Sequence, residues 1–126
     1  MEQKKVLLIN PPETMSLYKK SAIKAAISEI PYLSTAVLAA SLLKNDIETK
    51  ILDLSVVEDP IKELFLGLRK YNPTHVGVTF TTPLFFHGKK IAEMVKKYSE
   101  EVVLICGGVH PTVLPEETLK QTEFEI

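Results

Sequence analysis

The sequence has a single cysteine, Cys106, among 126 residues, and it has no tryptophan. One cysteine excludes an internal disulfide. Because Cys106 lies in an apolar run, we interpret its thiol as a small hydrophobic group. A chain without disulfides suits a reducing compartment, so we expect a cytoplasmic protein.

Long hydrophobic runs are also missing. The run Val6 to Ile9 follows two lysines, but Asn10-Pro11-Pro12 ends it well short of a signal peptide or a membrane-spanning helix. We therefore expect no targeting segment and no membrane span.

Neither sign of charge is in excess, because 15 Lys and Arg face 16 Asp and Glu for a formal net charge of -1. This balance gives no electrostatic footprint for a polyanion, so we expect no nucleic-acid partner. The 45% of hydrophobic and 25% of charged residues are typical of a globular protein, and 126 residues suit one domain.

What the chain does have is an alternation of short apolar runs with longer segments of helical period, which predicts βαβ units and a parallel sheet. The expected strands are Lys5 to Asn10, Glu48 to Leu54, His75 to Phe80, Glu101 to Cys106 and a short fifth strand from Glu123 to Ile126. The fold class that follows is α/β: a flavodoxin-like (Rossmann-like), doubly wound parallel sheet of about five strands in a three-layer αβα arrangement.

The expected helices lie between these strands. Ser34 to Asn45 is rich in Ala and Leu, and the next helix has Asp59 as its cap, Pro60 in its first position and Asn72-Pro73 at its end. A third helix follows Pro83, and a short one begins at Pro115.

The segment Glu13 to Ile30 is the least regular, and it is long for a loop after a first strand. It is either a lid or partner surface, or a short helix packed on the edge of the sheet.

Ligands of doubly wound sheets bind at the carboxyl ends of the strands, which directs attention to three loops. The loop at Asn10 to Met15 has no glycine, which excludes the phosphate turn of a dinucleotide-binding protein. After the third strand, Thr81 and Thr82 offer hydroxyls and Pro83 fixes the turn; alternatively, Thr82 only caps the next helix.

The loop after the fourth strand contains Gly107, Gly108, His110 and Thr112. Two adjacent glycines form either a tight turn or a place where another group approaches the main chain closely. His110 is either a loop histidine or a hydrogen-bonding or metal-binding group, although no second ligand lies at a recognisable spacing.

Taken together, these segments resemble the N-terminal cobalamin-binding domain of cobalamin-dependent radical S-adenosylmethionine enzymes. That group includes methyltransferases and the anaerobic magnesium-protoporphyrin IX monomethyl ester oxidative cyclase. The segments that carry the resemblance are Val6 to Pro12, Ile30 to Ala40, Ile51 to Asp53, Val76 to Thr79, Thr82 to Leu84 and Cys106 to Thr112.

The sequence departs from the wider cobalamin pattern in its first loop. Where many such domains carry Asp-x-His-x-x-Gly, this chain has Asn10, Pro12 and Met15, so the histidine that would ligate cobalt from below is missing. The resemblance therefore implies cobalamin bound without a protein histidine, which suits methyl transfer better than adenosyl-radical rearrangement.

A second departure concerns the iron-sulfur cluster. The Cys-x-x-x-Cys-x-x-Cys motif of radical S-adenosylmethionine enzymes is absent, and Cys106 alone cannot hold a cluster. We therefore expect residues 1–126 to be an excised N-terminal domain. Its catalytic domain, with a [4Fe-4S] cluster and S-adenosylmethionine, would follow downstream in the same polypeptide.

The resemblance implies a set of cofactor-binding residues, with no catalytic residue and no metal ligand in this chain. The nucleotide tail of cobalamin is expected near the glycine pair, and the threonines are expected to hydrogen-bond the tail or the corrin amides. The first loop is expected to line the lower face of the corrin. The histidine is expected near the rim of the site without ligating cobalt. The set comprises Asn10, Pro11, Pro12, Thr81, Thr82, Leu84, Gly107, Gly108, His110 and Thr112.

Two other functions are compatible with this fold class. A phosphorelay receiver needs an acidic cluster and a phosphate-accepting aspartate, but Asn10 and Thr81-Thr82 occupy those places. A cofactor-free platform for a substrate or partner in the parent enzyme is the closer alternative.

Overall fold

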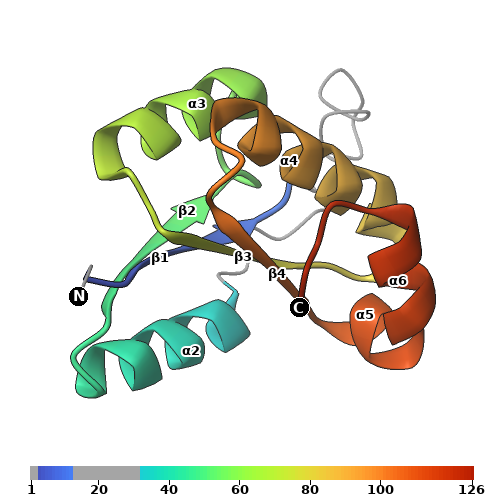
Figure 1. The fold of residues 1–126 in the computed structure, drawn as a ribbon, viewed down its shortest axis with the longest axis horizontal. Coiled ribbons are helices and arrows are strands. Elements are labelled where there is room, and N and C mark those ends of the chain that lie inside the picture. Colours follow the sequence, from blue (N-terminus) through green and yellow to red (C-terminus); the bar gives the residue numbers. More distant parts are fainter. Residues whose placement is uncertain (1–2, 13–31) are drawn as a thin grey trace, which may run out of the picture.

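The structure is a computed structural model that describes residues 3–12 and 32–126. Its sheet has four parallel strands in the order β2-β1-β3-β4, flanked by helices on both faces (Figure 1). The strands are β1 (Lys5–Asn10), β2 (Glu48–Asp53), β3 (His75–Thr79) and β4 (Val103–Gly107). This confirms the expected α/β, flavodoxin-like fold, while the segment Glu13 to Ile30 lies outside the described residues.

The helices follow the expected order, with one addition. They are α2 (Leu33–Lys44), α3 (Pro60–Tyr71), the 3-10 turn η2 (Thr82–Leu84), α4 (Phe85–Tyr98), α5 (Val109–Val113) and α6 (Pro115–Gln121). The five-residue helix α5 replaces the loop expected after the glycine pair. The strand expected from Glu101 begins two residues later, because the first bond of its ladder runs from Val103 N to Thr74 O, 3.1 Å.

Helix α3 shows how local sequence sets these boundaries. The side chain of Asp59 accepts a hydrogen bond from Lys62 N at 3.1 Å, and Pro60 takes the first helical position, where a missing N–H costs nothing. Asn72 ends the helix in the left-handed conformation, with φ 49°. The capping residues predicted from the sequence are therefore confirmed.

The two faces of the sheet are covered unequally (Figure 1). Alternate residues of β1, β3 and β4, such as Ile9, Val78 and Leu104, pack against α3 and α4 in the main core. The other residues face α2, where only Val6 and Leu8 of β1 form a small buried cluster with Ala39. We call the side of the sheet that carries α2 the α2 face.

Helix α2 differs from α3 and α4 in having apolar residues around most of its circumference. Only Thr35 and Ala39 are buried, and Leu33 is 75% exposed. Its exposed large apolar residues are Leu33, Val37, Leu38 and Leu43. Helix α2 packs mainly against β1 and β2, and it leaves these apolar side chains exposed.

The predicted fifth strand, Glu123 to Ile126, is not a strand in the structure. The segment still lies along the free edge of β4, because Glu125 N donates to Leu104 O at 2.9 Å and Cys106 N donates to Ile126 O at 2.7 Å. Only Glu125 and Ile126 bond to the β4 backbone in this way, which is too short a stretch to extend a regular ladder. Lys96 Nζ binds Glu125 Oε1 at 2.6 Å, and this hydrogen bond is the main cause that lowers the pKa of Glu125.

No helix in the described part of the chain is both long enough and apolar enough to cross a membrane.

The ring of Tyr71 lies in the core at the opposite end of the sheet from the glycine pair, below the ammonium groups of Lys5 and Lys50 at 4.7 and 4.8 Å. Tyr71 is 4% exposed, and among the described residues its hydroxyl has no hydrogen-bond partner. Burial, with a smaller effect of the Glu48 carboxylate, raises the pKa of Tyr71. The buried hydroxyl therefore carries a desolvation cost that no hydrogen bond from residues 3–12 or 32–126 offsets.

The variant Tyr71→Phe removes the buried hydroxyl and its desolvation cost. We therefore expect its free energy of unfolding at pH 7 to equal that of wild type or to exceed it by up to about 1 kcal/mol. Because the pKa of Tyr71 is higher in the folded chain than the value of about 10 in the unfolded chain, the fold favours the neutral phenol. This contribution is fully present below about pH 10 and is lost as the pH rises through the pKa of the folded chain. The variant should thus lose less stability in alkali. Urea unfolding at pH 7 and above pH 10 measures both effects.

Tyr98→Phe serves as the matched control, because the Tyr98 hydroxyl is exposed and bonds Asn72 Oδ1 at 3.2 Å. It should not share the alkaline effect. A clear loss of stability in Tyr71→Phe at pH 7 would show that the hydroxyl has a partner after all.

Candidate ligand site at the carboxyl edge of the sheet

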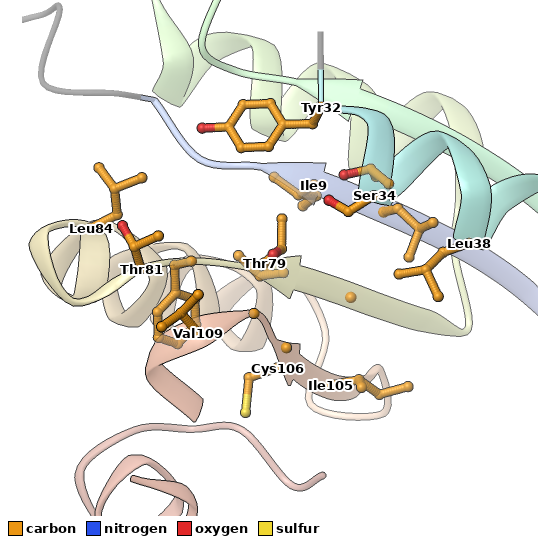
Figure 2. Close-up of a pocket in the computed structure, with 17 residues that line it drawn as sticks. Ile9, Tyr32, Ser34, Leu38, Thr79, Thr81, Leu84, Ile105, Cys106 and Val109 are labelled. Atoms are coloured by element: carbon orange, nitrogen blue, oxygen red, sulfur yellow. The ribbon is translucent and has the colours of Figure 1, made fainter. Parts of the chain in front are cut away.

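A pocket of about 660 Å³ opens on the α2 face at the carboxyl ends of β1, β3 and β4 (Figure 2). Its volume lies in the range of small-molecule sites. Among the described residues that line it, none is charged, and the polar groups that they offer are hydroxyls and backbone groups. The lining residues are Leu8, Ile9, Tyr32, Ser34, Thr35, Leu38, Gly77, Val78, Thr79, Phe80, Thr81, Leu84, Ile105, Cys106, Gly107, Gly108 and Val109.

The floor of the pocket is largely backbone. Gly77 pairs with Ile105 and Thr79 pairs with Gly107 in the β3–β4 ladder, and side-chain alternation directs all four toward the α2 face. Two of the four have no side chain. Tyr32 and Ser34 lie on the opposite side of the space, whereas the thiol of Cys106 points away from it (Figure 2).

The two glycines of the pair have different structural roles. Gly108 has φ 97° and ψ -171°, a region that only glycine occupies without strain, and an added Cβ would lie 2.8 Å from Phe80 O and from Thr79 Oγ1. At Gly107 an added Cβ would meet nothing within 4 Å. The chain itself therefore requires Gly108, while Gly107 leaves open space beside the pocket.

The end of β3 and the segment after it contribute four residues to the pocket: Thr79, Phe80, Thr81 and Leu84. Thr82 does not cap α4, which contradicts the alternative considered for it: it begins the 3-10 turn, and its Oγ1 lies 3.1 Å from Nδ1 of His110. Its hydroxyl is thus directed to α5 rather than to the end of α4.

His110 and Thr112 lie in α5 rather than in a loop, and neither lines the pocket. The imidazole of His110 is buried, with its ring centroid 4.8 Å from that of Phe85 and 5.8 Å from that of Phe80. Thr112 Oγ1 donates to Gly108 O at 2.7 Å within the same short helix. Both residues hold the end of the glycine loop in place.

The described part of the first loop, Asn10 to Pro12, lies outside the pocket lining as well. Asn10 is 2% exposed, and its Oδ1 accepts a 2.6 Å hydrogen bond from Thr35 Oγ1 of α2. Pro11 is fully buried and Pro12 is partly exposed, and neither lines the pocket. The Asn10 side chain thus joins the carboxyl end of β1 to α2, which forms one wall of the pocket.

Breaking this buried bond in Thr35→Val is expected to lower the free energy of unfolding by about 1–3 kcal/mol, because Asn10 Oδ1 remains buried without its donor. Thermal or urea unfolding measures the loss. Thr49→Val is the matched control: the Thr49 hydroxyl donates only to the nearby Ile47 O, at 2.9 Å, so a smaller loss is expected. Equal losses in the two variants would argue against a special role for the Asn10–Thr35 bond.

Sequence reasoning missed most of the described lining residues, among them Tyr32, Ser34, Leu38, Gly77, Ile105 and Val109. An isolated glycine inside a strand indicates close approach of another group, so Gly77 carried a usable signal. The others depend on which face of the sheet α2 covers, and the sequence pattern does not state that.

No metal-binding cluster is present in the described residues, since no group of three or more His, Cys, Asp or Glu side chains is close enough to hold an ion. The three histidines of the sequence are His75 at the start of β3, His87 in α4 and the buried His110, and none of them lines the pocket.

Comparison with known proteins places this fold and pocket in a family. Residues 21–126 match the family model of the B12 binding domain. The chain is also 30% identical over 122 residues to a protein of Pyrococcus horikoshii described as an uncharacterized methyltransferase. That alignment covers 96% of this chain and 25% of the relative, so the chain spans about a quarter of the relative's length. The chain therefore belongs to the B12-binding domain family.

Proposed function

We propose that this domain binds cobalamin in the pocket on the α2 face. The observation that carries the proposal is the backbone floor of the pocket, in which Gly107 leaves the space beside β4 open. Family membership supports the same ligand.

The residues of the pocket fit such a ligand. A nucleotide tail ends in a flat aromatic base, and flat groups pack well against backbone without side chains, such as that at Gly107, whereas the side chain of Leu8 lies close over Gly77. The corrin ring carries neutral amides, which suits the hydroxyl groups of the described wall residues. We therefore expect the tail along the glycine floor and the amides against Thr79 and Thr81.

Not all residues expected from the sequence would touch the ligand directly. Thr81, Leu84, Gly107 and Gly108 line the pocket, so we assign them to direct contact. We assign Thr82, His110 and Thr112 to support of the wall, and Asn10 with its neighbouring prolines to support of α2 and the end of β1. The lower face would then be met by α2 and the floor rather than by Asn10 and Pro12.

We further propose that no protein histidine ligates the cobalt. The support is that His110 lies behind the wall with its Nδ1 next to Thr82, while His75 and His87 lie elsewhere. Bound cobalamin would supply a cobalt centre that carries a methyl group for transfer. At saturating cobalamin, His110→Ala is expected to leave the cobalt absorption bands nearly unchanged, and a large band shift would reverse the assignment.

For the parent protein we propose a downstream radical S-adenosylmethionine domain, with its own [4Fe-4S] cluster, that carries out methyl transfer or oxidative cyclisation. The motif resemblance supports this, as does the longer relative described as a methyltransferase. In the full-length polypeptide, iron analysis and electron paramagnetic resonance of the reduced protein test it; a protein without a cluster would contradict it.

Titration of the chain with hydroxocobalamin, followed by visible absorption and equilibrium dialysis, tests the cobalamin proposal. We expect saturable binding of one cobalamin per chain. Cobinamide, a corrinoid without the nucleotide tail, should bind at least about 10-fold more weakly, which corresponds to about 1.4 kcal/mol of lost contact with the pocket. A folded chain that binds neither corrinoid would instead favour the cofactor-free platform.

A further inference from the structure

The loops after β3 and β4 both line the pocket, but a side-chain hydrogen bond between them lies behind the pocket wall. Nδ1 of His110, in α5, lies 3.1 Å from Oγ1 of Thr82, in the turn after β3. Residues close to both partners in the sequence line the pocket. They are Thr81 and Leu84 near Thr82, and Gly108 and Val109 just before His110. The bond therefore joins two stretches of pocket wall.

The surroundings of the imidazole are fixed by packing. His110 is 8% exposed and lies against the rings of Phe80 and Phe85. Phe80 is itself packed closely against Gly88 of α4, where an added Cβ would lie only 2.6 Å from the Phe80 ring. With the aromatic rings held in this way, the orientation that presents Nδ1 to Thr82 is predetermined.

Backbone bonds join the same two loops closer to the sheet. Phe80 N donates to Gly107 O at 3.0 Å, and His110 N donates to Phe80 O at 3.3 Å. These bonds lie on either side of Gly108. The contact between Thr82 and His110 extends the connection one step beyond the end of the sheet, where no strand pairing holds the loops together.

We propose that His110 is a positioning residue that, through Thr82, holds the loops after β3 and β4 together as one rigid wall of the ligand pocket. This inference rests on the proposed function for the identity of the ligand. It explains why a histidine that does not reach the pocket lies so near it. The hydrogen bond keeps the Thr81 hydroxyl and the Gly108 backbone in a fixed relative position, so the ligand need not order them on binding.

A double-mutant cycle tests the proposal. His110→Phe keeps an aromatic ring but removes Nδ1, and Thr82→Val removes the hydroxyl at nearly constant shape. In each single variant we expect the dissociation constant of hydroxocobalamin to rise about 10-fold over wild type. The double variant should show the same rise of about 10-fold, and not about 100-fold, because all three variants lose the same single bond. His110→Asn, which restores a polar atom near the place of Nδ1, should bind more tightly than His110→Phe.

Two control variants make the same chemical changes elsewhere. His87→Phe alters a histidine of α4 outside the pocket, and Thr49→Val removes a hydroxyl of β2 that donates to the nearby Ile47 O. Both should bind hydroxocobalamin within about twofold of wild type. Single variants at His110 and Thr82 that also bind like wild type, or effects that multiply in the double variant, would overturn the proposal.

Amide hydrogen exchange of the ligand-free chain separates this inference from the proposed function. Thr82→Val should speed exchange about 10-fold at the amides of His110 and Thr112 in α5, which donate to Phe80 O and Gly108 O. If the wild-type chain binds no cobalamin but this effect is present, the proposed function fails and the connection between the loops stands. Unchanged exchange across the loops refutes the connection, whatever the ligand.

Discussion

Replacing Gly108 with alanine is expected to lower the free energy of unfolding by about 3 kcal/mol. Two causes act together. The backbone at φ 97° and ψ -171° disfavours any residue with a Cβ, and this Cβ would lie 2.8 Å from Phe80 O, a backbone atom that cannot move aside without disturbing its bond from His110 N. Urea unfolding followed by circular dichroism measures the loss.

Gly67→Ala is the matched control for this substitution. Gly67 lies within α3, and an added Cβ would meet only the tip of the Leu52 side chain, at 3.0 Å. Because alanine favours a helix interior by about 1 kcal/mol over glycine, this variant should be as stable as wild type or slightly more stable. If Gly108→Ala were as stable as Gly67→Ala, the strain inferred for a side chain at Gly108 would be refuted.

The variant Gly107→Leu, at the neighbouring position, is expected to be nearly as stable as wild type. Its affinity for cobalamin should fall at least about 100-fold, which corresponds to about 2.7 kcal/mol. The space around an added Cβ at Gly107 is empty, so the chain accepts a side chain there. That side chain then occupies part of the pocket floor, where we expect the nucleotide tail. Unfolding curves and equilibrium dialysis with hydroxocobalamin measure the two quantities.

A smaller side chain at the same position should cause a smaller loss of cobalamin affinity. Gly107→Ala adds one methyl group and should weaken cobalamin binding less than Gly107→Leu, while cobinamide, which has no tail, should be affected less by either variant. Undiminished binding of hydroxocobalamin to a folded Gly107→Leu chain would remove the glycine floor from the ligand site. Together with Gly108→Ala, the series separates the requirement of folding from that of binding within two adjacent residues.

Much of the fold could be predicted from the sequence, because its elements carry strong local signals. Apolar runs define β1 and β3, and Asp59, Pro60 and Asn72 define α3 almost to the residue. Helix α5 carried no such signal. Its sequence, Val109 to Val113, contains a proline and β-branched residues, and the helix is held by tertiary contacts of His110 and by the bond from Thr112 N to Gly108 O, 3.2 Å.

The site was predictable in part for a related reason. The carboxyl ends of parallel strands meet at one edge, which brings Thr81 and Leu84 together with the glycine pair. The sequence does not state which of two adjacent residues faces which side of the sheet. It therefore could not separate Gly107 from Gly108, or Thr81 from Thr82, and it could not show that Asn10 bonds Thr35 rather than facing the pocket.

The strand order β2-β1-β3-β4 also determines how the chain must acquire its structure. Of the four described strands, β1 is synthesised first, yet it lies between β2 and β3 and pairs on one side with a strand that begins only at His75. No pair of neighbouring strands is joined by a hairpin, so each pairing must close a long loop, which slows folding. Until β3 is synthesised, the apolar residues Val6 to Ile9 keep an open backbone edge, and this early strand is where misfolding of a nascent or truncated chain would begin.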